Sequence, residues 1–378
     1  MKIGILTLPL HTNYGGILQA FALQKTLNRL GHEVILVNLP LPEPGKKERG
    51  KELFKRLVKK CLLFKSVPLR AWPTLKEREI ISQYITPFIR ENLKVLECPD
   101  KNNLLKLTLE EGFEGYVVGS DQVWRPVYSA SVSSFFLDFL KDFNLKKISY
   151  AASFGVDTWP FTEEEREKFG KLLSNFNAVS VREDSAVSLC KTYWNINARL
   201  VLDPTLLLDP EDYVTVCDLK GEPEERKLMV YMLDKSQERK NIIHKISKVT
   251  GLPLHEVMAK EKFWNAGSKG IDMCIVPSIS EWIAGFKNAG FVVTDSFHGM
   301  VFSILFRKPF ICIGNKNRGI TRFTSLLTLL KLKDRLIYSA ADIDENKIKE
   351  PIDYDQVDFI RQQEKKKSLL FIAKALNS

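Results

Sequence analysis

Residues 2–39 read KIGILTLPLHTNYGGILQAFALQKTLNRLGHEVILVNL. An apolar run at 2–8 is followed by a loop, by apolar side chains at helical spacing over 17–30, and by a second apolar run at 33–39. Two buried strands joined through a helix are typical of a parallel βαβ unit, because parallel strands need a crossover connection. Gly31 suits the left-handed conformation that commonly ends a helix. We therefore predict that a parallel sheet begins here.

The same alternation continues along the chain. In the first half, further buried strands are predicted at 115–118, 147–152 and 178–181. The charged segment 220–227, which contains Gly221 and Pro223, is the predicted linker. In the second half, strands are predicted at 228–233, 254–258, 291–294 and 309–313, and helices at 237–250, 279–289 and 297–306. This pattern predicts an α/β fold of two Rossmann-like, doubly wound parallel-sheet domains that face a cleft.

The length of 378 residues favours two domains over a single core. We place an N-terminal Rossmann-like domain at 1–219, a C-terminal Rossmann-like domain at 228–350, and a C-terminal helix at 351–378 that is long enough to cross back onto the first domain. Ligands of doubly wound sheets bind outside the carboxyl ends of the strands, so the active site is expected in the cleft between the domains.

Composition indicates a soluble globular protein, with 44% hydrophobic and 27% charged residues. No apolar run approaches the roughly 20 residues that cross a bilayer, and the start lacks a signal-peptide pattern, so we expect a cytoplasmic protein. The six cysteines are scattered, with no CxxC pair and no His at ligand spacing. We expect reduced, mostly packed thiols and no zinc site.

A net charge of +10 indicates anionic partners. Much of the excess lies in 46–64, where Lys and Arg alternate with the apolar residues Leu53, Phe54, Leu57, Cys61 and Phe64. This spacing predicts a basic amphipathic helix, which either packs on its own domain or makes peripheral contact with an anionic membrane. No aromatic-interleaved basic face and no nucleic-acid motif is found in the sequence, so we do not expect nucleic acid as a partner.

The first candidate site motif is TNYGG at 12–16, where a predicted strand passes into a helix. Gly15 and Gly16 would let the backbone approach a ligand, and the helix terminus offers unpaired N–H groups to a phosphate or carboxylate. Asn13 and Gln19 add polar side chains near the loop, and all four are candidate substrate-binding residues. A plain tight turn is the alternative.

The second motif is VVGSDQVWRP at 117–126, in which a predicted strand leads directly into polar and aromatic residues. Asp121 could orient or deprotonate a sugar hydroxyl, and Trp124 could stack on a sugar ring. Ser120 and Gln122 are candidate substrate contacts. The alternative is an Asp that caps the next turn and a Trp that belongs to the core.

Two arginines are candidates for anion binding. Arg182, in the motif AVSVRED, directly follows a predicted strand, and its planar fork suits a carboxylate or phosphate. The alternative for Arg182 is a local ion pair with Glu183 or Asp184. Downstream, a polar cluster could complete an anion pocket or form a solvated loop; its members are Asn315, Lys316, Arg318 and Arg322.

A further motif is VVTDSFHGMVF at 292–302, again at a junction from strand to helix. His298 could give or take a proton near neutral pH and is the main catalytic candidate. Its neighbours Asp295, Ser296, Phe297 and Gly299 are candidate substrate contacts, with Gly299 permitting the bend. A structural histidine is the alternative.

These motifs, in this order, resemble the polysaccharide pyruvyl transferase family. The likeness runs from Lys2 to about Leu330 and rests on TNYGG with the helix ILQAFALQ, on GSDQVW, on VSVREDSA, on VLDPTLLL and on TDSFHG. It implies a fold similar to two-Rossmann-type glycosyltransferases, phosphoenolpyruvate as co-substrate, no further cofactor and no required metal. It also implies that Arg182 and His298 help to hold the donor or to move its proton.

On this basis we expect the N-terminal domain to hold the acceptor and the C-terminal domain to hold the donor. The hypothesis assigns proton transfer to His298, anion binding to Arg182 with the helix terminus at Gly15 and Gly16, and acceptor orientation or base chemistry to Asp121. The acceptor would be a glycan or a lipid-linked saccharide, handled in the cytoplasm or at the inner membrane face. A nucleotide-sugar-dependent glycosyltransferase is the alternative, because the same architecture hosts that activity.

Overall fold

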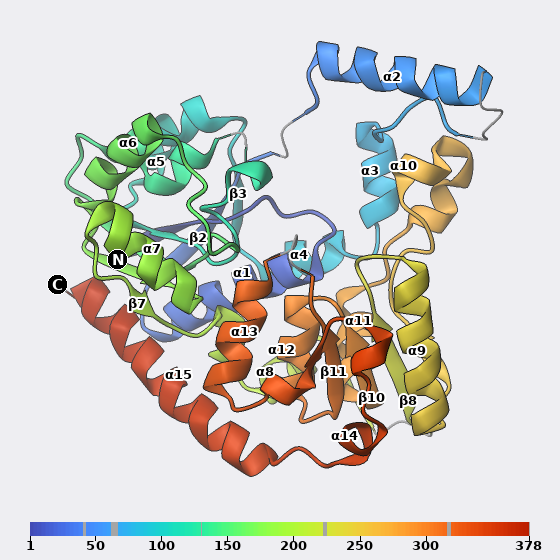
Figure 1. Ribbon diagram of the computed structural model, residues 1–378. Helices are drawn as coiled ribbons and strands as arrows, with labels where there is room; N and C mark the ends of the chain where they lie inside the picture. The colour runs from blue at the N-terminus through green and yellow to red at the C-terminus, as the bar shows by residue number, and fades with distance from the viewer. Residues whose placement is uncertain (41–42, 62–66, 130, 222–224, 316–318, 378) are drawn as a thin grey trace.

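The computed structural model describes residues 1–40, 43–61, 67–129, 131–221, 225–315 and 319–377. It contains two sheets of parallel strands, each covered by helices, so the predicted fold class is confirmed (Figure 1). The strands of the first sheet all come from residues 2–200, and those of the second from residues 227–337.

The first sheet has seven strands in the order β3-β2-β1-β4-β5-β6-β7. Their bounds are Lys2–Leu6 for β1, Glu33–Asn38 for β2, Val95–Glu97 for β3, Gly115–Val118 for β4, Lys146–Ala152 for β5, Ala178–Val181 for β6 and Arg199–Leu200 for β7. Since β1 lies between β2 and β4, the chain winds outward in both directions from the first strand. The loops that follow β1 and β4 therefore emerge side by side at the carboxyl edge.

The second sheet has five strands in the order β12-β11-β10-β8-β9. Their bounds are Lys227–Tyr231 for β8, Leu254–Glu256 for β9, Ala289–Thr294 for β10, Phe310–Ile313 for β11 and Leu336–Ile337 for β12. Here β10 lies between β8 and β11, which brings the loop after β8 next to the turn after β10.

All nine predicted strands are present, and three more were missed. The missed strands are β3, β7 and β12, each two or three residues long and each at the edge of its sheet. An edge strand is paired on one side and only partly buried, so it lacks the continuous apolar run by which central strands are recognised.

The α-helices of the first half are α1 Tyr14–Arg29, α2 Lys46–Cys61, α3 Leu75–Ser82, α4 Thr86–Asn92, α5 Leu104–Glu111, α6 Glu163–Leu173, α7 Asp184–Trp194 and α8 Pro210–Val216. Those of the second half are α9 Gln237–Thr250, α10 Phe263–Ala266, α11 Ile279–Lys287, α12 Phe297–Leu305, α13 Ile320–Leu329, α14 Glu345–Lys349 and α15 Tyr354–Asn377. Short 3₁₀ turns occur between them.

Helix α1 begins at Tyr14, three residues earlier than predicted, so TNYGG is largely its first turn and not a loop. The helix is almost wholly buried between the two halves, which supplies the tertiary contacts that outweigh the low helix propensity of Gly15 and Gly16. It ends as predicted, with Gly31 at a φ of +89°.

Helix α15 crosses from the second half to the first (Figure 1). At its start, the Tyr354 hydroxyl donates to the backbone carbonyls of Ser303 and Lys308 in the second half. Farther along, the Ser368 hydroxyl accepts a 3.0 Å hydrogen bond from the backbone N–H of Leu202, beside the first sheet. One helix thus contacts both halves.

The described part of the 46–64 segment is α2, and residues 62–64, including Phe64, lie outside the described residues. No helix of the described chain has the length and apolar character needed to span a membrane. All six cysteines are unpaired and five of them are buried, which confirms the expectation of mostly packed thiols.

Candidate active site

A cavity of about 490 Å³ lies between the two halves. It is bounded by the loop after β1, the first turn of α1, the loop after β4, the loop after β8, the β10–α12 junction and α13. Its lining residues are Leu8, Pro9, His11, Thr12, Asn13, Tyr14, Gly16, Asp121, Gln122, Tyr128, Tyr231, Leu233, Met258, Ala259, Val276, Asp295, Ser296, Phe297, His298, Arg322 and Phe323. This volume is in the usual range for a small-molecule site.

The structure divides the predicted site residues into three groups. Those that line the cavity are Asn13, Gly16, Asp121, Gln122, Asp295, Ser296, Phe297 and His298. Those that lie outside the lining are Gly15, Gln19, Ser120, Trp124, Arg182 and Gly299. Arg318, with Lys316, lies outside the described residues.

His298 lies in the first turn of α12 and is 6% exposed. Its imidazole contacts the backbone of α1 at Gly15, where an added Cβ would lie 1.9 Å from Nδ1. On the other side, Nε2 lies 3.7 Å from Oδ2 of Asp203. The ring is therefore held between a helix backbone and a buried carboxylate, at the edge of the cavity.

Asp203 is a buried carboxylate that sequence reasoning missed as a site residue. Its Oδ1 accepts hydrogen bonds from the backbone N–H of Thr205, at 3.0 Å, and from the Thr205 hydroxyl, at 2.6 Å. Its Oδ2 accepts a 2.5 Å hydrogen bond from Arg182. The available signal was the motif VLDPTLLL, in which Asp203 follows a strand that is only two residues long.

Arg182 is buried and lies behind the cavity, so the prediction that it faces a substrate anion is wrong for this structure. Its guanidinium donates to Asp203 at 2.5 Å and to Asp121 at 3.0 Å. The expected local partners do not apply either, since neither Glu183 nor Asp184 is the acceptor. Two carboxylates that follow strand ends thus pair with Nη1 and Nη2 of this buried arginine, while its Nε–H has no hydrogen-bond partner among the described residues.

These ion pairs keep both aspartates ionised. Burial would raise the pKa of the Asp203 carboxyl, but the Arg182 charge and the contact with His298 outweigh it and hold the pKa well below its usual range. Burial acts in the same way on Asp121, and the Arg182 charge again leads the effects that lower its pKa. Asp121 is thus better suited to accepting hydrogen bonds than to acting as a base.

Among the residues that the structure describes, Arg322 of α13 is the arginine that lines the cavity. Its guanidinium lies 3.6 Å from Asp121 and over the ring of Phe297, with 5.3 Å between the guanidinium carbon and the ring centroid. The guanidinium of Arg182 lies over the same ring, at 4.7 Å. Burial and then the neighbouring Arg182 charge lower the pKa of Arg322 to about 10, so it stays cationic at neutral pH.

Gln19 and Ser120 connect the loops behind the cavity. The Gln19 side chain donates to the Thr7 hydroxyl and to the Gly16 carbonyl, and accepts from the backbone N–H of Ser120, each at 3.0 Å. The Ser120 hydroxyl donates to the carbonyl of Ala151. Both side chains are fully buried, so the prediction of direct substrate contact is corrected to a role in holding these loops.

Trp124 is 0% exposed and belongs to an aromatic core cluster. Its ring stacks on Phe136 at 5.3 Å, and its indole N–H donates to the carbonyl of Phe135. It has no face left for a sugar, so the stacking prediction is wrong and the alternative, a core tryptophan, is confirmed. Its neighbour Gln122 does line the cavity and accepts a 2.7 Å hydrogen bond from Arg125.

The residues around His298 form its local frame. Asp295 accepts hydrogen bonds from the backbone N–H groups of Leu233, at 2.6 Å, and Asp234, at 3.1 Å, which joins β10 to the loop after β8. Burial raises the pKa of Asp295. The Ser296 hydroxyl caps α12 by accepting from the N–H of Gly299. At Gly299 an added Cβ would lie 2.2 Å from the Thr294 hydroxyl, so glycine is required for close packing.

The N-termini of α1 and α12 both meet the cavity, because Asn13, Gly16, Ser296 and Phe297 line it. Each terminus carries unpaired N–H groups and a partial positive charge. Together with Arg322 they make one wall of the cavity suitable for an anion. Among the described residues, no group of three or more His, Cys, Asp or Glu is arranged to hold a metal ion.

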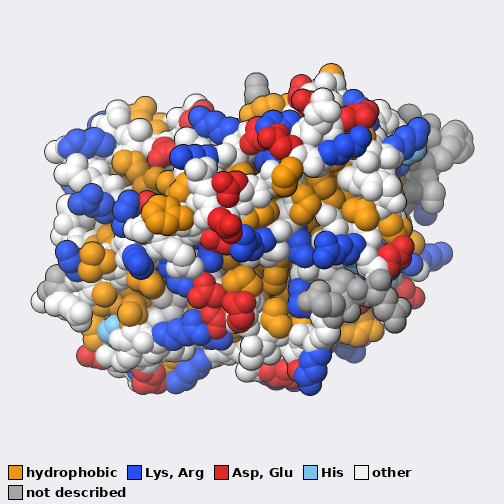
Figure 2. All heavy atoms as spheres, turned by 90° about the horizontal axis from the view of Figure 1, so that it is seen from below, with side chains coloured by type: hydrophobic (Ala, Val, Ile, Leu, Met, Phe, Trp, Pro, Cys, Tyr) orange, Lys and Arg blue, Asp and Glu red, His pale blue; other side chains and the backbone are white. Residues whose placement is uncertain are grey.

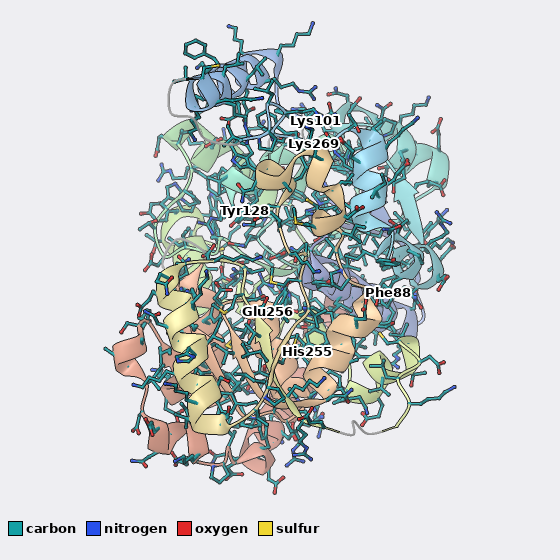
Figure 3. The ribbon with its side chains drawn as sticks, turned by 90° about the vertical axis from the view of Figure 1, so that its right-hand side faces the viewer. Phe88, Lys101, Tyr128, His255, Glu256 and Lys269 are labelled. Carbon is teal, nitrogen blue, oxygen red and sulfur yellow. The ribbon has the colours of Figure 1, made fainter. Side chains whose placement is uncertain are left out.

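Aromatic residues in the lining were also missed. Tyr14 donates a 2.8 Å hydrogen bond to the carbonyl of Pro277 and stacks on Trp282, which ties the first turn of α1 to the second half. In Figure 3, Tyr128 belongs to the upper half of the molecule, while His255 and Glu256 mark the lower half. Tyr128 follows the GSDQVW motif, so its position in the sequence was the available signal.

Comparison with known proteins gives a family and a fold. The family model described as polysaccharide pyruvyl transferase matches residues 13–317. No curated protein matches the chain significantly. Among solved structures, a UDP-GlcNAc 2-epimerase from Neisseria meningitidis bound to UDP-GlcNAc is similar, with a TM-score of 0.52, 10% identity and coverage of 100% of this chain and 99% of that chain. Medicago truncatula UGT71G1 complexed with UDP-glucose is also similar, with a TM-score of 0.50, 10% identity and coverage of 100% and 98%.

Proposed function

The chain belongs to the polysaccharide pyruvyl transferase family, and we propose that it transfers pyruvate from phosphoenolpyruvate to two hydroxyls of a glycan or lipid-linked saccharide, forming a ketal. The observation that carries this proposal is the position of His298, at the edge of a cavity whose wall combines Arg322 with two helix N-termini. A proton-handling group beside an anion-binding wall is what addition to an enol phosphate requires.

In the proposed reaction, the methylene carbon of phosphoenolpyruvate gains a proton and becomes a methyl group. One acceptor hydroxyl adds to the neighbouring carbon, and its proton replaces the one delivered. The bond from that carbon to the phosphate oxygen then breaks, phosphate leaves, and the second hydroxyl adds and loses its proton to the departing phosphate. The products are one cyclic ketal and one phosphate, so atoms and charges balance.

The residues take the following roles in this proposal. His298 delivers the proton to the methylene carbon, and the Asp203 carboxylate, 3.7 Å from Nε2, stabilises the protonated imidazole through its charge. Arg322 and the helix termini bind the carboxylate and phosphate of the donor. Asp121, kept ionised by Arg182, accepts a hydrogen bond from an acceptor hydroxyl and orients it. No cofactor or metal has a role in this scheme.

The acceptor enters from the N-terminal half. The donor binds mainly on the C-terminal half, at Arg322 and the N-terminus of α12, and the N-terminus of α1 meets it from the opposite half. Polar side chains of the N-terminal half that line the cavity include Asn13 and Gln122, and we assign these two to the acceptor together with Asp121. We place the reaction in the cytoplasm, with peripheral contact at the inner membrane face where the acceptor is lipid-linked.

Mass spectrometry tests the activity directly. Candidate saccharides incubated with the protein and phosphoenolpyruvate should gain the mass of a pyruvyl ketal, and phosphate should be released in equal amount. Phosphoenolpyruvate should also raise the thermal unfolding temperature, while UDP-sugars should not. Stabilisation by a UDP-sugar without phosphoenolpyruvate binding would instead favour the nucleotide-sugar-dependent glycosyltransferase and remove the present proposal.

A further inference from the structure

Helix α2 lies at the edge of the molecule, beyond α3 and α10 and away from both sheets (Figure 1). The side view shows the same arrangement, with α2 at the top and side chains extending outward from it (Figure 3). Among its residues, Arg56 alone is classed as buried. A helix this long that buries so little apolar surface obtains little stability from its own domain.

The contact that attaches α2 is polar and reaches the second half. The Arg56 guanidinium donates to the carbonyls of Pro68, at 2.8 Å, and Trp264, at 3.0 Å, and pairs with Glu52 at 2.9 Å. Its guanidinium carbon also lies 4.3 Å from the centroid of the Trp264 ring. Because an arginine makes this contact, the apolar stripe of the helix is not used for packing.

That apolar stripe is exposed. Leu53 is 44% exposed, Phe54 68% and Leu57 40%, and Cys61, one turn beyond Leu57, is exposed as well. Residues three and four apart share one side of a helix, so these side chains form a continuous ridge. The helix is thus solvated and attached to the rest of the chain through Arg56, and its apolar ridge stays exposed.

The rest of the helix surface is basic. Exposed lysines are present along its whole length, at Lys46, Lys47, Lys51, Lys55, Lys59 and Lys60. The two acidic residues are Glu48 and Glu52, and Glu52 is paired with Arg56. On the face seen from below, opposite α2, positive and negative side chains are instead interspersed (Figure 2). The charge excess is thus concentrated beside the apolar ridge.

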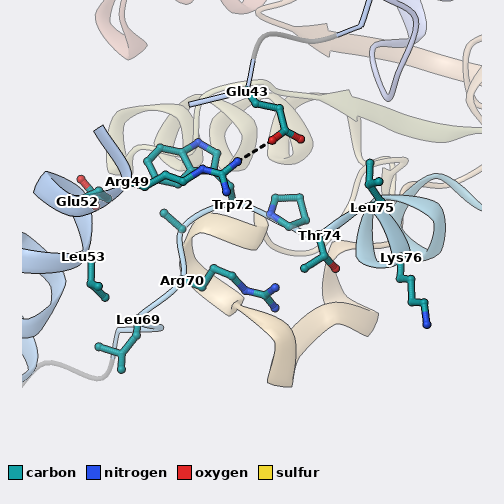
Figure 4. Close-up of a pocket in the computed structure, with 12 residues that line it drawn as sticks. Glu43, Arg49, Glu52, Leu53, Leu69, Arg70, Trp72, Thr74, Leu75 and Lys76 are labelled. Atoms are coloured by element: carbon teal, nitrogen blue, oxygen red, sulfur yellow. Dashed lines mark hydrogen bonds and ion pairs between the residues drawn. The ribbon is translucent and has the colours of Figure 1, made fainter. Parts of the chain in front are cut away.

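An apolar groove adjoins the ridge. It encloses about 800 Å³ between α2 and the segment 69–76, and Leu53 belongs to both the ridge and the groove. Figure 4 shows Leu53 and Leu69 at one end of the groove and Leu75 at the other. Several charged groups at its rim are paired: Arg49 with Glu43, Arg70 with Glu77 and Glu52 with Arg56. The groove therefore adds apolar surface on the side where the ridge is exposed.

We propose that α2 and this groove form a docking surface for an anionic lipid bilayer, with Leu53, Phe54 and Leu57 entering the headgroup region. The exposed lysines match the negative charge of the lipid headgroups, and the apolar ridge matches the apolar layer that begins beneath them. An acidic protein partner would match the lysines, but it would not require so large an unpartnered apolar ridge.

The docking surface is connected to the cavity through α3. Glu43, at the groove, pairs with Arg78 of α3 at 3.4 Å. Arg78 also lies near enough to His11, which lines the cavity, for its charge to act on that imidazole. The bilayer would thus lie on the side of the molecule where the loop after β1 enters the cavity. This arrangement suits an acceptor carried on a lipid, and that part of the inference depends on the proposed function.

Vesicle sedimentation tests the docking surface. The full chain should sediment with vesicles of phosphatidylglycerol and phosphatidylcholine, and far less with phosphatidylcholine alone. Phe54→Ser should weaken binding on the order of tenfold, because one aromatic side chain no longer enters the bilayer. Replacing Lys51, Lys55 and Lys59 together with Glu should abolish binding to the anionic vesicles.

Phe359→Ser is the matched control. Phe359 of α15 is 67% exposed, nearly the same as Phe54, but it lies far from α2. Its replacement should leave vesicle binding unchanged, and circular dichroism should show both variants folded. Equal binding by Phe54→Ser and the wild-type chain, or no binding by the wild-type chain, would overturn the proposal. Transfer to a water-soluble acceptor should be the same in Phe54→Ser, so failure of docking and failure of the proposed activity are separable.

Discussion

Gly15 of α1 lies directly against the imidazole of His298, so closely that a methyl group on Gly15 would be 1.9 Å from Nδ1. The glycine comes from the first half of the chain and the histidine from the second. Their contact joins the two halves at the edge of the cavity, and it depends on the absence of a side chain at position 15.

Gly15→Ala should displace the imidazole and lower transfer on the order of 100-fold, since small misplacements of catalytic groups have effects of that size. It should also cost about 1–3 kcal/mol of stability through overpacking. Gly16→Ala is the comparison, because its Cβ would first meet the flexible Asn13 amide, at 3.1 Å. In urea unfolding, adding His298→Ala to Gly15→Ala should recover the lost stability, and an additive double variant would contradict the contact.

His298→Gln should abolish transfer while leaving phosphoenolpyruvate binding nearly intact, because the binding wall is formed by other groups. Arg322→Ala should instead act on binding. It should weaken donor binding about 10- to 100-fold, the usual effect of losing charged hydrogen bonds. Thermal shift titration measures binding, and phosphate release measures turnover. If both variants lost binding equally, the division of roles would be wrong.

Asp203→Asn should destabilise the protein by about 3–5 kcal/mol, because Arg182 would keep its buried charge and lose its closest partner. Glu110→Gln is the control, since Glu110 pairs with Lys106 at 3.7 Å on the surface and such pairs contribute about 1 kcal/mol or less. Urea unfolding with unchanged m-values measures both. Similar losses of unfolding free energy in the two variants would show that the buried ion pair stabilises the protein no more than the surface pair does.

The same carboxylate predicts a pH dependence. The pKa of Asp203 is lower in the folded protein than in the unfolded chain, so the unfolded chain binds more protons as the pH falls. The stabilisation is complete above pH of about 4, the ordinary carboxyl pKa, and is lost as the pH falls below it. The difference in unfolding free energy between the wild-type chain and Asp203→Asn should therefore shrink on acidification. A constant difference down to low pH would contradict this.

Trp124→Phe should reduce stability by about 2–3 kcal/mol, because it opens space in the aromatic core and leaves the Phe135 carbonyl without its donor. It should leave KM for the acceptor unchanged. Tyr128→Phe gives the opposite test, since Tyr128 is 42% exposed and lines the cavity. A large change of KM in Trp124→Phe would restore its predicted role in substrate binding.

The central strands and main helices were predictable because each carries its own periodic apolar pattern. The site was predictable only as far as the strand ends. After β4, Ser120, Asp121, Gln122 and Trp124 follow one another, yet only Asp121 and Gln122 reach the cavity. The direction in which a side chain points after a strand ends depends on the backbone angles, such as the φ of +70° at Asp121. The spacing of residues in the sequence does not reveal these angles.

Charge pairing over long sequence distance was equally hidden. Arg182 follows a strand and resembles a ligand clamp in sequence, but its acceptors lie 61 residues before it and 21 residues after it. Such partners are brought together by sheet order, and that order places the ends of β4, β6 and β7 near one another. A local motif therefore identified the cation and missed the carboxylate that holds it.

Helix α15 comes after both sheets in the chain, yet it contacts both halves, through Tyr354 at one end and Ser368 farther along. The two halves also share a core around α1, whose Tyr14 stacks on Trp282, so α15 is a second link and not the sole one. A cut between the second sheet and this helix would leave the link through α1 to hold the halves together. The opening would then be free to vary more in width, and the affinity for anything that bridges the halves should fall.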